Sequence, residues 1–200
     1  MTSWSFSNCY SGWIGHVWDG TLDTLLDERD GLLNTNGTVF DEKGNLYICE
    51  YATGSILKFY PDGRLVTLSA RDHHGRRFNR PNDIIMSPGG FLYFTDPKSY
   101  DPDEHDGRLF RVHPETGETV WLVEGLQFPN GLCLSPDGKT LYIGESVDKN
   151  ILKINSGTGS LDTLITLPSG EQDPERHGVR CGRQSLRGIF RRGQDLRDIP

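Results

Sequence analysis

The chain has 200 residues, a net charge of −7, 34% apolar residues and 24 glycines. This length is enough for one domain with a sizeable core, and the glycine content favours many short strands joined by tight turns over a helical bundle. The acidic balance gives no general attraction for nucleic acid or for an anionic membrane. The sequence contains no run of 18 apolar residues, so no transmembrane helix is expected. We therefore expect neither nucleic acid nor a membrane as a partner.

Residues 1–35 carry only a weak pattern. The N-terminus lacks a basic region followed by an apolar stretch, so no signal peptide is expected. Apolar residues between positions 13 and 18 are compatible with a strand, whereas the leucines between positions 22 and 26 fit either a short helix or the edge of a sheet. We interpret this segment as the remnant of a preceding structural unit.

From position 36 the chain contains three copies of one pattern. NGTVFDEKGNLYICE begins at Asn36, NDIIMSPGGFLYFTD at Asn82 and NGLCLSPDGKTLYIGE at Asn130, so the copies begin 46 and 48 residues apart. Each copy indicates a strand, a turn rich in Gly, Asp or Pro, and a second strand, and two more strands follow it. A period of about 40 to 50 residues built from short strands is typical of a β-propeller with one blade per repeat. The sequence therefore predicts an all-β fold with about three to four four-stranded blades over residues 36–170.

The three asparagines begin the innermost strand of each predicted blade, near the central channel where a propeller holds its site. Amide oxygens are hard, neutral ligands, and together with one or two carboxylates they suit Ca²⁺. An equally good alternative is that each asparagine caps the turn before its strand. Asp83, directly after Asn82, could act as a general base toward a bound water, or it could be held by backbone N–H groups at the start of its strand.

Three acidic residues occupy equivalent positions at the end of the second strand of each blade, namely Glu50, Asp96 and Glu145. Their equivalence favours a structural role over a catalytic one. His73 and His74 are adjacent in a segment between two blades. Because neighbouring residues of a strand face opposite ways, we do not expect them to act as a pair.

Cys49 and Cys133 fall in predicted strands, where buried free thiols are expected. This cysteine usage favours a reducing compartment, and we expect a cytoplasmic protein. The sequence contains no G-x-S-x-G, Walker, G-x-G-x-x-G or H-E-x-x-H motif. A nucleophilic serine or a zinc protease is therefore not expected.

The repeat stops before the C-terminus, and residues 171–200 are expected to be irregular. Residues 175–200 contain seven arginines and no lysine. They could form a basic nucleic-acid arm or a disordered tail. A third hypothesis is a frameshift. With synonymous codons chosen freely, a frame shifted by one base can read PNGMACDVEGNLYVAYFGAGKIYVIS, a fourth copy whose asparagine falls at Glu175, 45 residues after Asn130.

Three segments resemble one known family. FNRPNDIIMSPGGFLYFTDP (78–97) and FPNGLCLSPDGKTLYIGES (128–146) resemble the signature blades of the SMP-30/gluconolactonase/LRE-like family. NGTVFDEKGNLYICEYATGSILKFYPDGRLVTL resembles the blade before them in the gluconolactonase branch. The resemblance covers about residues 36–167. It implies a six-bladed β-propeller, of which this chain would be a truncated or frameshifted member with an incomplete ring.

The resemblance also implies metal-dependent hydrolysis of a small-molecule lactone, opening a sugar lactone to the hydroxy acid. One divalent ion, Ca²⁺ or alternatively Zn²⁺ or Mg²⁺, would polarise the lactone carbonyl. Asn82 and Asn130 match the two asparagines of the family's metal shell, Asn82 would also bind substrate, and Asp83 lies at a position tied to catalysis. The family's metal shell also includes a glutamate from an E-G-P motif in the first blade and an aspartate from a later blade. In this sequence no E-G-P motif precedes Asn36, and the aspartate would fall beyond residue 175. We therefore expect weak or absent activity, with a non-catalytic propeller fragment or binding scaffold as the alternative.

Overall fold

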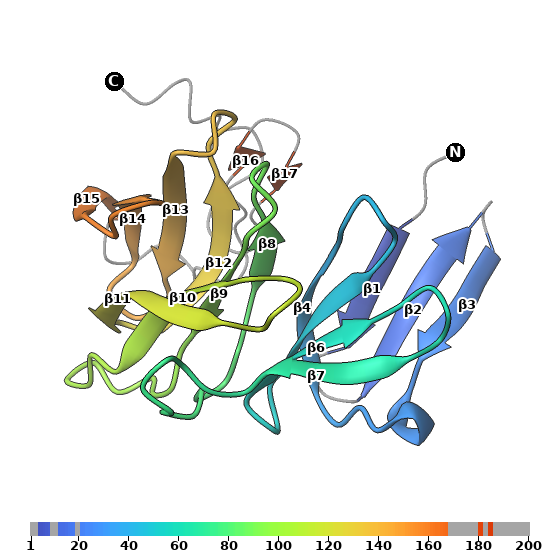
Figure 1. Cartoon of the computed structure of the whole chain (residues 1–200). Coiled ribbons are helices and arrows are strands. Elements are labelled where there is room, and N and C mark those ends of the chain that lie inside the picture. The colour runs from blue at the N-terminus through green and yellow to red at the C-terminus, as the bar shows by residue number, and fades with distance from the viewer. Residues whose placement is uncertain (1–3, 9–11, 19–20, 168–179, 182–183, 186–200) are drawn as a thin grey trace.

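The computed structural model describes residues 4–8, 12–18, 21–167, 180–181 and 184–185. These residues form one three-stranded and three four-stranded antiparallel sheets, which follow one another in chain order, and a two-stranded sheet (Figure 1). The first sheet holds β1 (Trp4–Asn8), β2 (Trp13–Trp18) and β3 (Thr21–Leu26). The second holds β4 (Thr35–Phe40), β5 (Leu46–Glu50), β6 (Ser55–Phe59) and β7 (Leu65–Ser69). The third holds β8 (Ile84–Met86), β9 (Leu92–Asp96), β10 (Gly107–Val112) and β11 (Thr119–Leu126). The fourth holds β12 (Pro129–Leu134), β13 (Thr140–Glu145), β14 (Asn150–Asn155) and β15 (Leu161–Thr166).

The predicted all-β propeller architecture is confirmed. Within each four-stranded sheet, strands consecutive in the sequence are hydrogen-bonded neighbours. This is the up-and-down order of a propeller blade. As expected, each of the three repeats contributes four strands, namely β4–β7, β8–β11 and β12–β15. Of the two alternatives for the leucines between positions 22 and 26, the edge of a sheet is correct and the short helix is wrong, because this segment pairs with β2 as the outer strand of the first sheet.

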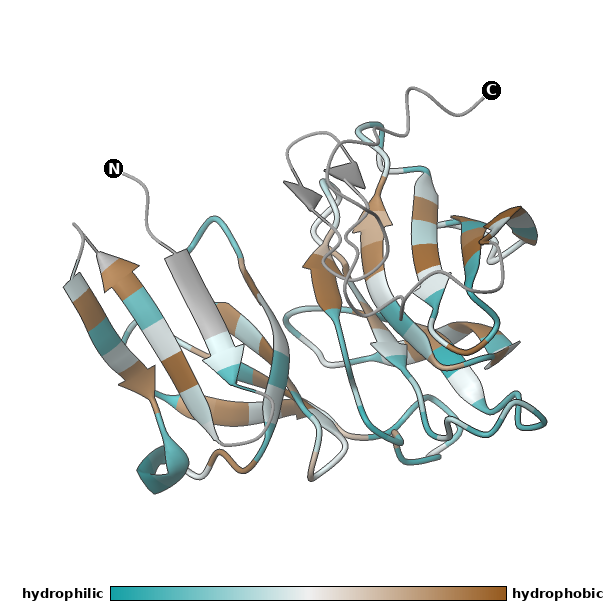
Figure 2. Cartoon of the chain, turned by 180° about the vertical axis from the view of Figure 1, so that it is seen from behind, coloured by the Kyte–Doolittle hydropathy of each residue, from teal (hydrophilic) through white to brown (hydrophobic). Residues whose placement is uncertain are grey.

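The second and third sheets bury both faces, because each lies between two neighbouring sheets. In β5, Leu46 and Ile48 pack with residues of the first sheet, whereas Tyr47 and Cys49 between them pack with residues of the third. Successive strand residues point to opposite faces, so a strand buried on both sides has a nearly continuous apolar sequence. Figure 2 shows the hydrophobic residues concentrated on the strands and the hydrophilic residues in the connecting loops.

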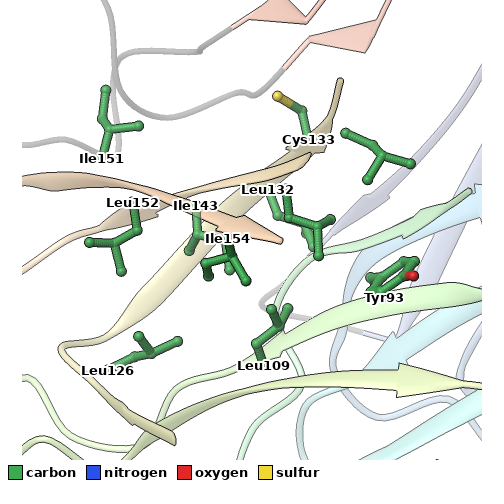
Figure 3. Close-up of a cluster of buried hydrophobic side chains, with 11 residues drawn as sticks. Tyr93, Leu109, Leu126, Leu132, Cys133, Ile143, Ile151, Leu152 and Ile154 are labelled. Atoms are coloured by element: carbon green, nitrogen blue, oxygen red, sulfur yellow. The ribbon is translucent and has the colours of Figure 1, made fainter. Parts of the chain in front are cut away.

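The third and fourth sheets share the largest of these layers (Figure 3). Its buried members include Tyr93 and Leu109 from the third sheet, and Leu132, Ile143 and Ile154 from the fourth. Burying an aliphatic side chain of this size stabilises a fold by roughly 1.5–3 kcal/mol. Packing between blades therefore supplies much of the apolar driving force that fixes one sheet against the next.

A carboxylate at the end of the second strand anchors the segment that enters each four-stranded blade. Glu50 Oε1 accepts a hydrogen bond from the backbone N–H of Asn34 at 2.7 Å, and Glu145 Oε1 accepts one from that of Gln127, also at 2.7 Å. Asp96 does the same in the third sheet. The structural role predicted for these three acidic residues is confirmed.

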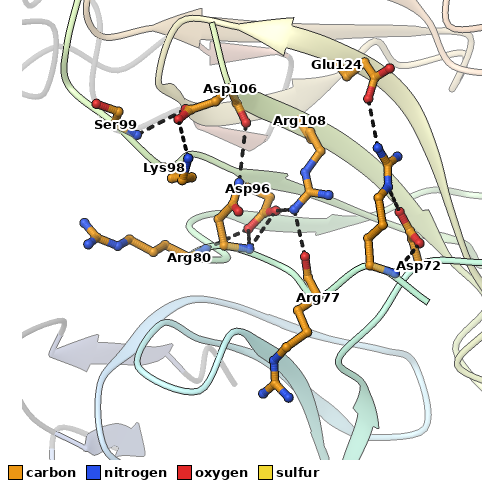
Figure 4. Close-up of polar contacts among 11 residues, drawn as sticks. Asp72, Arg77, Arg80, Asp96, Lys98, Ser99, Asp106, Arg108 and Glu124 are labelled. Atoms are coloured by element: carbon orange, nitrogen blue, oxygen red, sulfur yellow. Dashed lines mark hydrogen bonds and ion pairs between the residues drawn. The ribbon is translucent and has the colours of Figure 1, made fainter. Parts of the chain in front are cut away.

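Asp96 has the most elaborate network of the three (Figure 4). Its side chain is fully buried, and its oxygens accept the backbone N–H groups of Asn79 and Arg80 at 2.8–3.0 Å. The guanidinium of Arg108 pairs with it at 2.8 Å and also donates to the carbonyl of Arg77 at 3.0 Å. Burial raises the pKa of Asp96 to about 6, although the N–H groups and Arg108 favour its charged form. Asp96 is therefore ionised at neutral pH and holds β9, β10 and the entering segment together.

The segment between β7 and β8 places two histidines side by side, contrary to expectation. His73 and His74 lie in a turn and not in a strand, and the Asp72 carboxylate closes this turn by accepting the N–H groups of His74 and Arg76 at 2.9 Å. Both imidazoles lie against Trp121, with ring centroids 4.6 Å from it and 4.0 Å from each other. The expectation that His73 and His74 face opposite ways is therefore wrong, because it assumed that they lie in a strand.

The cysteines differ in state. Cys49 is a free, buried thiol, as expected. Burial, helped by the charges of Asp83 and Asp96, raises its pKa well above the usual range, so it is no thiolate nucleophile. Cys133 is disulfide-bonded, so the expected free thiol at this position is wrong. The cysteines therefore no longer favour a reducing compartment. Within the described residues, no helix is long and apolar enough to cross a membrane.

Most of the arginine-rich segment 171–200 lies outside the described residues, and so do the arm, tail and frameshift interpretations made for it. The parts that are described, β16 (Arg180–Cys181) and β17 (Gln184–Ser185), form a two-stranded antiparallel sheet. Both of its strands contact β12.

Replacing Asp96 with alanine should destabilise the fold strongly. The change leaves the Arg108 guanidinium buried without its carboxylate and frees two backbone N–H groups. Breaking a buried pair in this way costs about 3–5 kcal/mol. The free energy of unfolding, measured by urea titration, should fall by that amount. Asp62→Ala, which removes an exposed carboxylate 3.7 Å from Arg64, should cost less than about 1 kcal/mol. Equal losses in the two variants would contradict the anchoring role.

Candidate functional site

The innermost strands of the blades are joined to one another where the repeats begin. The N–H of Gly37 donates to the carbonyl of Asn82 at 2.7 Å, and the Ser7 hydroxyl donates to the carbonyl of Asn36. A methyl group at Gly37 would lie 2.7 Å from the Asp83 Cα and 2.9 Å from the Asn82 carbonyl oxygen. The first and second repeat openings are therefore so close that only glycine fits between them.

The third opening is joined to the second in the same way. The hydroxyl of Thr95 donates to the carbonyl of Asn130 at 2.8 Å, and the N–H of Leu132 donates to Asp83 Oδ2 at 3.1 Å. We call the set of hydrogen bonds that join Ser7, Asn36, Gly37, Asn82, Asp83, Thr95, Asn130 and Leu132 the axial belt. It brings the backbones of all the sequence-predicted site residues together.

Two of the three openings carry a β-bulge. In β4 the register shifts between Thr35 and Thr38, and in β12 it shifts between Pro129 and Leu132. In each case the extra residue falls at the Asn-Gly pair. A bulge releases a residue from the ladder and re-aims its side chain, and such bulges are frequent beside active sites. The repeated Asn-Gly thus marks the point where the inner strand leaves regular pairing.

The three carboxamides differ in how they are held. Asn82 is 9% exposed, yet its side chain forms no hydrogen bond with any described residue, and the same is true of the half-buried Asn36. Asn130 donates from Nδ2 to Ser146 Oγ at 3.3 Å. Among the described residues, the side-chain polar atoms that are fully buried without a hydrogen-bond partner belong to Asp106, Arg108 and Gln127, and none belongs to Asn82. The Asn82 carboxamide therefore keeps contact with solvent and is open to a water, an ion or a ligand.

Asp83 is half-buried and sits between two blades. Its Oδ1 accepts the N–H of Ile84 at 2.9 Å, and its Oδ2 accepts the N–H of Leu132. Burial raises the pKa of Asp83 to about 6, and the two hydrogen bonds oppose this rise. Asp83 is thus held by backbone N–H groups, one of the two roles predicted for it. A carboxylate with this pKa can also accept a proton near neutral pH.

The donor chemistry fits part of a shell for a hard divalent cation. The described residues contain no group of three or more His, Cys, Asp or Glu side chains that could hold a metal. They do provide the amide oxygens of Asn36, Asn82 and Asn130 and the carboxylate of Asp83. Ca²⁺ accepts neutral amide oxygens and carboxylates, six to eight in all, and completes its shell with water or substrate. One carboxylate offsets only half of its charge, which lowers its affinity.

Two residues of this region were not predicted from the sequence. Thr95 precedes the anchoring carboxylate of its blade, where the other copies have Cys49 and Gly144. Ser146 follows the carboxylate, where the other copies have Tyr51 and Pro97. Because these positions differ among the copies, the repeat gave no signal for them.

Comparison with known proteins agrees with this architecture. Residues 35–174 match the model of the SMP-30/gluconolactonase/LRE-like region. The chain is 34% identical over 143 residues to a protein named gluconolactonase from Zymomonas mobilis, covering 66% of this chain and 40% of that protein. It is 38% identical over 128 residues to strictosidine synthase-like protein 3 of Arabidopsis thaliana, covering 58% and 32%.

A solved structure described as a gluconolactonase from Xanthomonas campestris superposes with a TM-score of 0.70 at 28% identity. It covers 85% of this chain and 60% of the other. The chain thus spans about a third to three fifths of the length of these relatives. The family model covers well over half of the chain, and this protein belongs to the SMP-30/gluconolactonase/LRE-like family.

Proposed function

We propose that this protein carries the lactone-hydrolysing site of a gluconolactonase. The observation that supports this best is the Asn82 carboxamide, which forms no hydrogen bond with the described residues and is open to a ligand, next to Asp83, whose pKa is raised to about 6. Both residues fall within the region that matches the family. The names of the relatives from Zymomonas mobilis and Xanthomonas campestris support a lactone as the substrate class.

In this proposal Asn82 and Asn130 hold a divalent ion, Ca²⁺ first and Zn²⁺ or Mg²⁺ as alternatives, and Asn82 also contacts the substrate. The bound ion would polarise the lactone carbonyl. The Asp83 carboxylate accepts a proton from the water that attacks this carbonyl. The ring C–O bond then breaks, and the released oxygen takes up the proton. The product is the open-chain hydroxy acid.

The alternative is a propeller that binds without catalysing a reaction. The hydrogen bonds of Asp83 favour this alternative, since its carboxylate already accepts the backbone N–H groups of Ile84 and Leu132, and the second of these bonds ties β8 to β12. A scaffold of this kind predicts no acid release from a lactone and no rise of the melting temperature with Ca²⁺.

Removal of either asparagine side chain tests the ion site. Wild-type protein should release acid from gluconolactone in the presence of Ca²⁺ and lose this activity with a chelator. Asn82→Ala and Asn130→Ala should each lower the rate at least about tenfold, because each removes an oxygen ligand. Asn155→Ala is the matched control and should retain activity, because this asparagine ends β14 and its carboxamide oxygen only accepts the N–H groups of the turn that follows. Chelator-resistant hydrolysis that survives both substitutions would contradict the proposed site.

The pH dependence tests the role of Asp83. The ionised carboxylate is the proton acceptor, so the enzymatic rate, after subtraction of uncatalysed hydrolysis, should rise through pH 6 and then level off. Asp83→Asn should lower the plateau by about 10²–10⁴-fold. A rate that is unchanged in Asp83→Asn would exclude Asp83 as the base.

Stability gives a second, activity-independent readout of the same group. Because the pKa of Asp83 is higher in the folded protein than in the unfolded chain, its contribution to stability is complete below about pH 4 and is lost as the pH rises through about 6. Between pH 4 and pH 7 the unfolding free energy of wild type should therefore fall relative to Asp83→Asn by on the order of 1–3 kcal/mol. Parallel pH profiles of the two proteins would show that burial does not perturb Asp83.

A further inference from the structure

We propose that Ser146 is a positioning residue that fixes the carboxamide of Asn130 with its oxygen free for a ligand. This inference rests on the proposed function, and it adds the residue that sets the orientation of one ligand. It makes Asn130 the pre-organised member of the site, whereas Asn36 and Asn82 must be oriented by the ligand itself.

Ser146 contacts the third repeat opening through two separate groups. Its hydroxyl accepts the Asn130 Nδ2–H₂ at 3.3 Å, and its backbone N–H donates to the carbonyl of Phe128 at 3.1 Å. The first contact occupies the amide nitrogen, so the group that Asn130 presents to other partners is Oδ1. The amide nitrogen carries only N–H donors and would repel a cation. The orientation of the carboxamide therefore decides whether Asn130 can act as a ligand.

The equivalent positions of the other repeats show that this hydroxyl contact is specific to Asn130. Tyr51 also donates its backbone N–H to the residue two positions before its asparagine, at 2.8 Å, but its hydroxyl accepts from Arg80 at 3.1 Å. Pro97 has neither a backbone N–H nor a hydroxyl. Accordingly, the carboxamides of Asn36 and Asn82 form no hydrogen bond with the described part of the chain.

The backbone before Asn130 is held in an unusual conformation by the same contacts. Phe128 has φ +45°, one of two positive values among the described residues other than glycine. Its ring is 3% exposed and is stacked on Tyr100, with centroids 3.5 Å apart. The preceding Gln127 is anchored by Glu145. A non-glycine residue in this region carries a free-energy cost and persists only where its surroundings fix it, often at a ligand site. Ser146 thus belongs to a rigid frame around Asn130.

The test is a double-mutant cycle read by calorimetric titration with Ca²⁺. Loss of an orienting partner of a metal ligand weakens metal binding by about 10–100-fold. Ser146→Ala should show this loss, and Ser146→Thr, which keeps the hydroxyl, should bind nearly as wild type does. In an Asn130→Ala background, Ser146→Ala should cause no further loss, because there is no carboxamide left to orient. Unchanged affinity in Ser146→Ala, or the same loss in both backgrounds, would overturn the proposal.

A second readout separates this proposal from the proposed function. If wild-type protein binds no Ca²⁺, the ion site fails, and the orientation is then judged by the side-chain amide signals in a ¹H–¹⁵N NMR spectrum. The Asn130 signals should shift in Ser146→Ala and remain in Ser146→Thr, while those of Asn82 stay in place in both. Asn130 signals that do not respond to Ser146→Ala would overturn the proposal whatever the outcome of the titration.

Discussion

The axial belt is the constraint on which the rest of this molecule depends. Apolar packing can hold two sheets face to face, but it tolerates sliding, because it has no direction. The hydrogen bonds from Gly37 to Asn82 and from Leu132 to Asp83 join successive blades at fixed points. They bring three repeat openings together that lie 46 and 48 residues apart in the sequence. A site composed of single residues from different blades requires this registration.

The belt and the candidate site use the same residues in different ways. The asparagines contribute their backbone carbonyls to the belt, and their carboxamides remain for other partners. Asp83 contributes its side chain to the belt, which leaves one carboxylate with both a structural and a chemical task. Burial between blades also raises its pKa to about 6, so the packing that stabilises the fold makes this group a proton acceptor near neutral pH.

The anchoring carboxylates hold the irregular segments that lead into the site. The segments that enter each blade leave N–H groups that no strand can satisfy, and Glu50, Asp96 and Glu145 accept them. Asp96 is fully buried and is also paired with Arg108. The entering segments are thereby rigid, which allows the residues after them to be placed accurately.

The repeat made the architecture predictable, because a blade has the same strand order wherever it occurs. It also identified Asn82, Asp83 and Asn130 as neighbours and gave the equivalent acids their structural role. It failed where copies differ or where no copy exists. Ser146 has no counterpart in the other repeats, and the strand at residues 21–26 lies outside them. The paired histidines were missed because a turn, and not a strand, sets the direction of their side chains.

The most direct test of the axial belt is the free energy of unfolding of Gly37→Ala. The added methyl group would meet the backbone of Asn82 and Asp83 at 2.7–2.9 Å. Overpacking of this kind costs about 1–3 kcal/mol. Gly89→Ala, where the nearest atom to the new methyl is 3.9 Å away, is the matched control and should change stability by less than about 1 kcal/mol. A clear loss in Gly37→Ala alone is the predicted result. If the two variants were equally stable, the repeat openings would not be in contact, and the blades would not share one site.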